Sequence, residues 1–163
     1  METYKRRMPV LKLESGACTV YCKIKLLPEE DILSYGLDEV YKINWDVNGG
    51  IDCGCVGIAF SGAIAKLSKM LSSALQGAFL DTFTPDDDEN FEIELFKEED
   101  TNEYVMLLRL FLDPGYSYDN ISLYFNEKNI NALLVYCQLF EGKLDKSDKI
   151  VQQYYDLGIF QGD

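Results

Sequence analysis

Apolar and polar side chains alternate along the first part of the chain, and a period of two is typical of β-strands with one face on a core. Residues 10–13 and 17–26 predict a β-hairpin, because the turn dipeptide Ser15-Gly16 lies between them. In the second of these segments one face is apolar and would point toward the core; it consists of Cys18, Val20, Cys22, Ile24 and Leu26.

The same kind of pattern predicts further strands. Residues 28–44 are polar and acidic, so we expect a loop with a short helical turn there. The turn signal Asn48-Gly49-Gly50 comes next, and the apolar run after it predicts a strand over residues 51–60. Later in the chain three segments predict a β-meander, and the middle one is nearly continuous in apolar residues, as in a central strand covered on both faces; the segments are 91–95, 104–112 and 119–125.

Helical spacing replaces alternation in two places. Residues 62–76 predict a helix that begins after Ser61 and stops at Gly77. Residues 127–141 predict a second helix, with Asn126 as its cap and Gly142 after its end. Residues 147–158 predict a short amphipathic helix in the tail.

This order of elements predicts the fold class. Consecutive strands favour an antiparallel sheet, so we predict a single α+β domain in which the hairpin, the strand and the three-strand meander form a mainly antiparallel sheet with two main helices packed on it. The sequence has no internal repeat and no linker-like stretch. We expect residues 1–9 and 159–163 to be flexible.

Charge then narrows the function. The 163 residues include 15 Lys and Arg against 28 Asp and Glu, a net charge of −13, and no histidine. A body of this charge repels phosphates, which argues against direct binding of nucleic acid. Without histidine there is no Ser-His-Asp triad, no Cys-His dyad and no histidine metal site. The carboxylates lie in segments expected to be exposed turns, where a raised pKa is hard to achieve. We therefore predict a non-enzymatic protein with no catalytic residues.

The five cysteines leave one alternative open. They are an odd number in a chain with no disulfide-rich pattern, so we expect small buried thiols. Zinc would need four thiolates from neighbouring strands, Cys18 and Cys22 with Cys53 and Cys55, but neither pair has the usual C-x2-C spacing. We predict no metal and no cofactor.

The N-terminus bears on location. Lys5, Arg6 and Arg7 are positive, but the apolar stretch of a signal peptide does not follow them. No run of apolar residues is long enough to cross a membrane. We expect a cytoplasmic protein that does not bind membranes.

The negative charge is concentrated in one window. Residues 81–104 carry eleven acidic side chains and one basic one, a net −10, whereas residues 1–26 carry a net +4. On a folded sheet such side chains would form a negative field that attracts basic partners, although charge runs often serve solubility alone. We predict a partner-binding surface with Tyr116 and Tyr118 as contacts at its rim; its acidic members are Asp86, Asp87, Asp88, Glu89, Glu92, Glu94, Glu98, Glu99, Asp100 and Glu103.

Two single residues have competing interpretations. Arg109 is alone in its apolar run, and a structural ion pair across the sheet is favoured over a ligand clamp. A deep pocket lined by carboxylates and Arg109 would instead indicate a small hydrolase or a ligand-binding domain. Trp45 is either a core residue or an interface anchor.

A family resemblance completes the prediction. The segment from Gly57 to Gly62, the helix after it, the acidic meander and the closing residues 124–127 resemble small bacterial immunity proteins of contact-dependent growth inhibition and wall-associated toxin systems. This resemblance covers residues 51–142, while the acidic segment 27–50 does not map onto it. It implies a cytoplasmic antitoxin, an inhibitor that neutralises a cognate toxin domain with a basic surface, often a nuclease.

The alternative to this toxin-inhibitor function is an acidic adaptor that mimics nucleic acid, or a regulator of a nucleic-acid-binding host protein.

Overall fold

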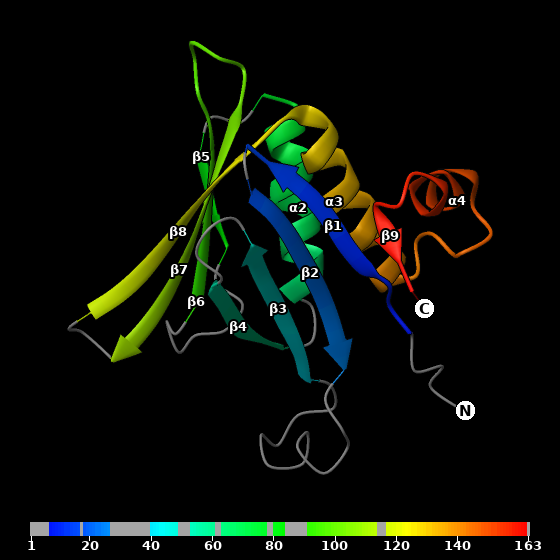
Figure 1. Ribbon diagram of the computed structural model, residues 1–163, viewed down its shortest axis with the longest axis horizontal. Coiled ribbons are helices and arrows are strands. Elements are labelled where there is room, and N and C mark those ends of the chain that lie inside the picture. The colour runs from blue at the N-terminus through cyan, green and yellow to red at the C-terminus, as the bar shows by residue number, and fades with distance from the viewer. Residues whose placement is uncertain are drawn as a thin grey trace.

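The computed structural model is an α+β fold with two antiparallel sheets (Figure 1). It describes residues 7–16, 18–26, 40–48, 53–60, 63–77, 80–83, 91–113 and 117–162. The prediction of a single α+β domain built mainly from antiparallel strands is confirmed. The strands are divided between two sheets, however, where the sequence predicted one.

The first sheet has five strands in the order β4-β3-β2-β1-β9. All neighbouring strands in it are antiparallel. The predicted hairpin forms its centre, and the predicted strand after residue 50 forms one edge. The strands are β1 (Val10–Ser15), β2 (Cys18–Leu26), β3 (Val40–Asn48), β4 (Cys53–Phe60) and β9 (Phe160–Gln161).

The second sheet has four antiparallel strands in the order β5-β6-β7-β8. Strands β6 to β8 are the predicted meander, and β7 has a partner on each side. The strands are β5 (Leu80–Phe83), β6 (Phe91–Lys97), β7 (Tyr104–Asp113) and β8 (Ser117–Phe125).

The helices follow the predicted ranges closely. Helix α2 (Ala63–Leu75) ends before Gly77, whose φ of 102° suits glycine. Helix α3 (Glu127–Glu141) begins at a capping box, in which Asn126 and Asn129 each accept the other's backbone N–H at 2.9 Å. Helix α4 (Lys149–Asp156) is short and buries Val151.

One continuous core joins both sheets to the helices. In Figure 1, α2 and α3 lie side by side against the sheets, while α4 lies apart from them next to β9. The inner faces of β2, β3, β6 and β7 are apolar, as their alternation requires. Trp45 and Tyr136 are the largest fully buried side chains, so Trp45 is a core residue and not an interface anchor.

Three sequence predictions are corrected here. Residues 40–44, predicted as loop, begin strand β3, in which Ile43, Trp45 and Val47 alternate toward the core. Strand β5 was missed because it has only four residues. The end of the chain, predicted to be flexible, instead forms β9, where Phe160 is 1% exposed and packs against Tyr136, Tyr154 and Tyr155.

Candidate functional site

The turn between β6 and β7 carries the acidic residues that the sequence singled out. Glu99, Asp100 and Glu103 are exposed, and Glu98 is half-buried. The Glu98 N–H donates to the Glu103 carbonyl at 2.8 Å, and the Thr101 hydroxyl donates to the Glu98 carboxylate at 3.0 Å. These hydrogen bonds fix the turn, so its carboxylates project from a defined position. We call these four residues, Glu98, Glu99, Asp100 and Glu103, the acidic turn.

Two more predicted residues lie on the outer face of β6. Glu92 and Glu94 are half-buried there and stand opposite Arg109 and Leu107 of β7 in the sheet register. The backbone thus places Arg109 where the predicted ion pair across the sheet requires it. That pairing stays a prediction, because the structure describes only the strand position of Arg109.

The structure places none of the other predicted residues at this surface, because five of them are not among the described residues and one is placed only by its strand register. Asp86, Asp87, Asp88 and Glu89 lie outside the described residues, as does Tyr116. Tyr118 is placed only by its register opposite Phe111. The partner-binding role of the whole set therefore stays a prediction.

A row of apolar side chains next to the acidic turn was missed at the sequence level. Phe96, Val105 and Tyr124 stand opposite one another on β6, β7 and β8. Tyr124 is 49% exposed and Phe96 is half-buried. We call these three residues the aromatic row. The sequence could have indicated Phe96, because it follows Glu92 and Glu94 at intervals of two residues and side chains two apart on a strand share a face.

Three described basic residues lie together, away from the acidic turn. The Tyr136 hydroxyl donates to the Pro9 carbonyl at 2.8 Å and accepts the Ile24 N–H at 3.0 Å, which holds the start of the chain beside the end of β2. Arg7 and Lys25 are exposed at this end, and Lys23 is half-buried. We call Arg7, Lys23 and Lys25 the basic end.

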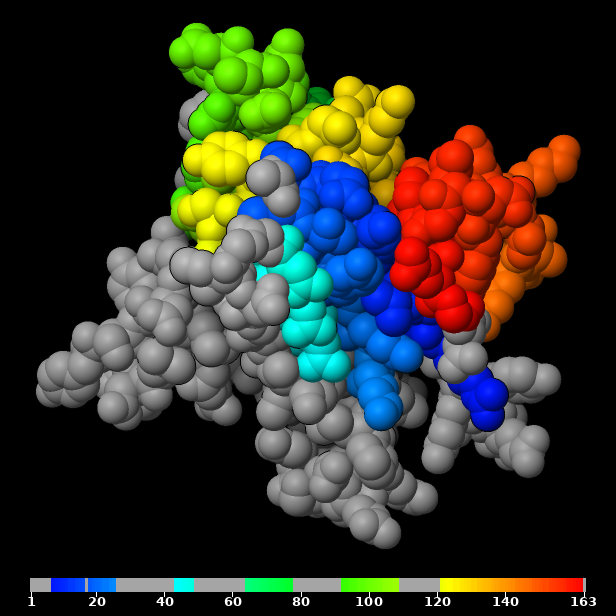
Figure 2. Space-filling model, in the orientation of Figure 1, coloured from blue at the N-terminus to red at the C-terminus, as the bar shows by residue number. Residues whose placement is uncertain are grey.

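A sheet face that none of the described helices covers continues from the basic end. Lys23 and Lys25 alternate with core residues of β2, so they lie on its outer face together with Tyr21, which is half-buried. Figure 2 shows the atoms of β1, β2 and β3 open to the viewer, and the helices lie on the other side of this sheet in Figure 1. The face therefore offers positive charge beside an aromatic ring.

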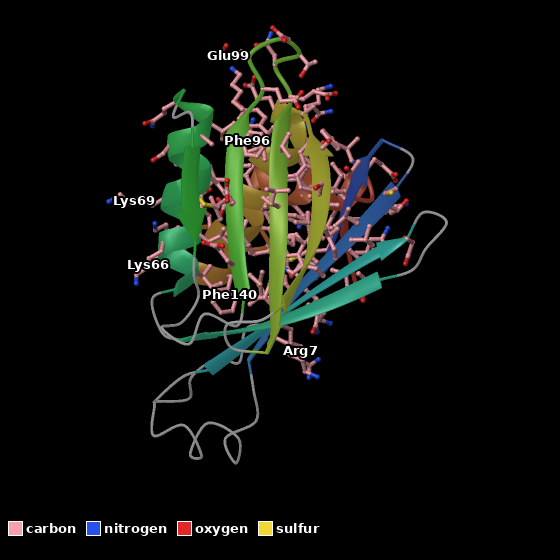
Figure 3. All side chains as sticks on the ribbon, turned by 90° about the vertical axis from the view of Figure 1, so that its left-hand side faces the viewer. Arg7, Lys66, Lys69, Phe96, Glu99 and Phe140 are labelled. Atoms are coloured by element: carbon pink, nitrogen blue, oxygen red, sulfur yellow. The ribbon has the colours of Figure 1, made fainter. Side chains whose placement is uncertain are left out.

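The two charged groups lie far apart. In Figure 3, Glu99 is at the top of the molecule, and Arg7 lies well below it, toward the lower end of the described residues. The net charge of −13 is thus distributed unevenly over the structure. Surface charges farther apart than about 8 Å are largely screened from one another at physiological salt. The two ends therefore act as separate electrostatic surfaces.

The described cysteines lie on β2, β4 and α3. Strand β3 separates β2 from β4, and Cys22 and Cys55 stand on either side of Trp45 in the register. The two cysteine pairs thus lie on strands that are not neighbours, so the condition for the zinc alternative is not met. Burial first, and Glu141 second, raise the pKa of Cys137 to about 12, so this thiol stays protonated.

In the described part of the chain, no cluster of three or more histidine, cysteine, aspartate or glutamate residues could hold a metal ion. Nor does any helix there have the length and apolarity to span a bilayer.

The geometry defines a two-sheet α+β protein in which the acidic turn and the basic end are separate groups. No protein-family description and no curated protein matches the sequence. Among solved structures, the fold is similar to that of the plant transcriptional regulator PBF-2, with a TM-score of 0.51, 8% identity, and 94% of this chain and 95% of that chain covered. WHY1 from Arabidopsis thaliana gives a TM-score of 0.48 at 8% identity, with 82% and 88% covered.

These comparisons correct the predicted function. A solved structure that is similar over nearly the whole chain is that of a transcriptional regulator, so the prediction of a toxin-neutralising immunity protein or antitoxin is wrong. The predicted toxin partner and the exclusion of direct nucleic-acid contact are wrong as well. The exclusion used the net charge of the whole chain, whereas the structure brings Arg7 near Lys23 and Lys25 through the hydrogen bonds of Tyr136.

Proposed function

We propose that the protein is a regulator that binds single-stranded nucleic acid through the basic end and the outer face of β2. The observation that carries the proposal is the grouping of Arg7, Lys23 and Lys25 beside Tyr21 at a sheet face that none of the described helices covers. Proteins that bind single strands combine positive side chains along the backbone path with aromatic rings on which bases stack. The similarity to a transcriptional regulator supports a role of this class.

A flat sheet face suits single strands better than duplexes. Proteins that read a duplex usually insert a helix or a β-ribbon into the major groove. On the outer face of β2 the positive side chains instead alternate with residues of the core, so they lie in a row along the strand. Unstacked bases could lie on this face with Tyr21 beneath one of them.

The acidic turn limits the affinity without preventing binding. It lies at the other end of the molecule, so its field at the basic end is screened at physiological salt. At low salt the screening is weaker, and the negative body repels the strand. We therefore expect modest affinity and a salt dependence set by a few phosphate contacts.

The test compares charge reversals at two places. The double variant Lys23→Glu with Lys25→Glu should weaken binding of a labelled single strand of about 20 nucleotides at least about tenfold, and its slope of log K against log salt should be smaller by about 1.4, since each phosphate contact contributes about 0.7. Fluorescence anisotropy with DNA and RNA strands at several salt concentrations measures both effects. The matched control reverses Lys66 and Lys69, which are exposed on α2 (Figure 3).

Two results would contradict the proposal. One is that the unaltered protein binds neither strand at any of the salt concentrations. The other is that the α2 control loses as much affinity as the β2 variant, which would mean that any positive charge on the molecule serves equally well.

A further inference from the structure

We propose that the acidic turn and the aromatic row together form a docking surface for a basic amphipathic protein segment, which has large apolar side chains on one face and Lys and Arg on the other. The two groups are adjacent, since Phe96 and Val105 are separated from the acidic turn only by the Lys97 and Tyr104 pair in the register. This surface lies away from the basic end, so the inference is independent of the nucleic-acid proposal.

The aromatic row supplies the apolar part of the surface. Directly opposite side chains in antiparallel strands have Cβ atoms about 5 Å apart, so Phe96, Val105 and Tyr124 form one continuous strip. Val105 is only 4% exposed although it shares the outer face, and Phe96 and Tyr124 are its neighbours across the two strand pairs. The helices lie behind this sheet in Figure 3, so none of them covers the strip.

The backbone under the strip is held in place. The Tyr124 N–H donates to the Ser15 hydroxyl at 2.9 Å, which ties the edge of β8 to the end of β1. The other two residues lie within continuous strand pairs. A surface fixed in this way loses little conformational entropy when a partner binds, and aromatic anchors on it can contribute strongly.

Charge decides the chemistry of the partner. The acidic turn borders the strip on one side, and Glu127 at the start of α3 is exposed close by. Glu127 lies near enough to Tyr104, at the foot of the acidic turn, to contribute to the raised pKa of that phenol after burial itself. The described basic residues nearby are Lys97, which lies over the Tyr104 ring at 5.8 Å, and Lys128.

Carboxylates therefore outnumber ammonium groups around the strip, and a complementary partner carries positive charge. The same carboxylates would repel the phosphates of a nucleic acid or of an anionic membrane. A second copy of this chain is a poorer occupant, because two bodies of −13 repel each other. A basic amphipathic segment satisfies both the strip and its rim, and Lys/Arg-rich segments are common in proteins that bind nucleic acid.

The test uses a defined probe, a synthetic helical peptide of about 16 residues with Leu and Trp on one face and Lys on the other. Isothermal titration with the full chain should detect binding. Tyr124→Ser with Phe96→Ser should weaken it at least about tenfold, and Glu99→Lys with Asp100→Lys should weaken it and reduce its dependence on salt. The matched control is Ile150→Ser with Leu157→Ser, which removes apolar side chains exposed on and just after α4.

Several outcomes would overturn the inference. An oligolysine of equal length and charge that binds as well as the probe would show that the aromatic row contributes nothing. Equal losses in the α4 control would show that the site is not on the four-stranded sheet. Sedimentation that shows a dimer of the unaltered protein, lost in Tyr124→Ser, would make a second copy the occupant.

The single variant Tyr124→Ser guards against misfolding, because this side chain is half exposed and its removal leaves the core intact. If the double variant is unfolded by circular dichroism, unchanged peptide binding by Tyr124→Ser would by itself overturn the proposal. Single-strand binding should be unaffected by all these variants except for general charge effects, so failure here and failure of the nucleic-acid proposal are distinguishable.

Discussion

Tyr136 joins three parts of the chain through one side chain. It comes from α3, is 0% exposed, and its hydroxyl bonds to the backbone of Pro9 and of Ile24. Its ring also packs edge-on against Phe160 of β9 at a centroid distance of 5.7 Å. The hydroxyl therefore provides hydrogen-bond partners for the buried Ile24 N–H and Pro9 carbonyl, which lie beyond the paired residues of β1 and β2. It also positions the basic end, because Arg7 comes two residues before Pro9.

Removing this hydroxyl should destabilise the protein. Tyr136→Phe keeps the ring but leaves the Ile24 N–H and the Pro9 carbonyl without a partner, so the free energy of unfolding should fall by about 2 kcal/mol. Urea denaturation at neutral pH measures the change. Tyr124→Phe is the control, because Tyr124 is half exposed, and its change should stay within about 0.5 kcal/mol.

The same variant makes a prediction about alkaline pH. Burial first, and the neighbouring Cys22 thiol second, raise the pKa of Tyr136 well above 10.0. Above the unfolded pKa the unfolded chain loses this proton while the folded one keeps it, so stability is complete below that pH and falls as pH rises toward the folded pKa. Tyr136→Phe should therefore lose less stability than the unaltered protein between about pH 8 and about pH 10.5. Equal losses would contradict this account.

At the scale of elements, helix ends and sheet edges decide how the parts are held. Asn126 and Asn129 close a capping box at the start of α3, directly after β8, so this cap fixes where the strand turns into the helix. Gly142, with φ of 78°, ends the helix at the other side. At the edge of the five-stranded sheet, β9 pairs with only two residues of β1, and Phe160 anchors it.

The cap gives a prediction at this scale. Asn126→Ala removes the acceptor for the Asn129 N–H and should lower the free energy of unfolding by about 1 kcal/mol. Thermal and urea denaturation measure the loss. Asn126→Ser, which keeps a capping oxygen, should restore most of it, whereas equal losses in both variants would show that the cap is not what stabilises this junction.

At the scale of the whole molecule, charge is separated into two ends. The acidic turn and the basic end act on different partners in the two proposals, and the body between them is the apolar core shared by both sheets. Exposed like charges in the acidic turn repel one another and cost stability. A large net charge favours solubility and fast association with partners of opposite charge, but it does not stabilise the fold.

This separation predicts a salt effect on stability. The melting temperature should rise between about 20 mM and about 200 mM NaCl, because salt screens the repulsion within the acidic turn. In Glu99→Gln with Asp100→Asn and Glu103→Gln the rise should be smaller. Asp156→Asn, at the end of α4, is the control and should behave like the unaltered protein. A melting temperature that does not respond to salt would contradict the prediction.

Strand β2 and helix α3 could be predicted from local signals. Residues 18–26 alternate between core and solvent, and residues 127–141 have helical spacing between two capping residues. Residues 40–48 show the limit. Their alternation is regular, but the acidic stretch before them and the charged residues within them favoured a loop. Strand β9 could not be predicted, because two residues become a strand only when β1 and Tyr136 are already in place to receive them.

Local residue patterns were enough to predict the α+β class, the main helices and the negative charge of the meander, since these depend on residues close together in the chain. The tertiary structure alone decided that the strands form two sheets. It also decided that Phe96, Val105 and Tyr124 make one strip and that Arg7 stands with Lys23 and Lys25. Each of these groupings joins residues that are distant in the sequence. They are brought together by strand register and buried hydrogen bonds, and no local pattern specifies either of these.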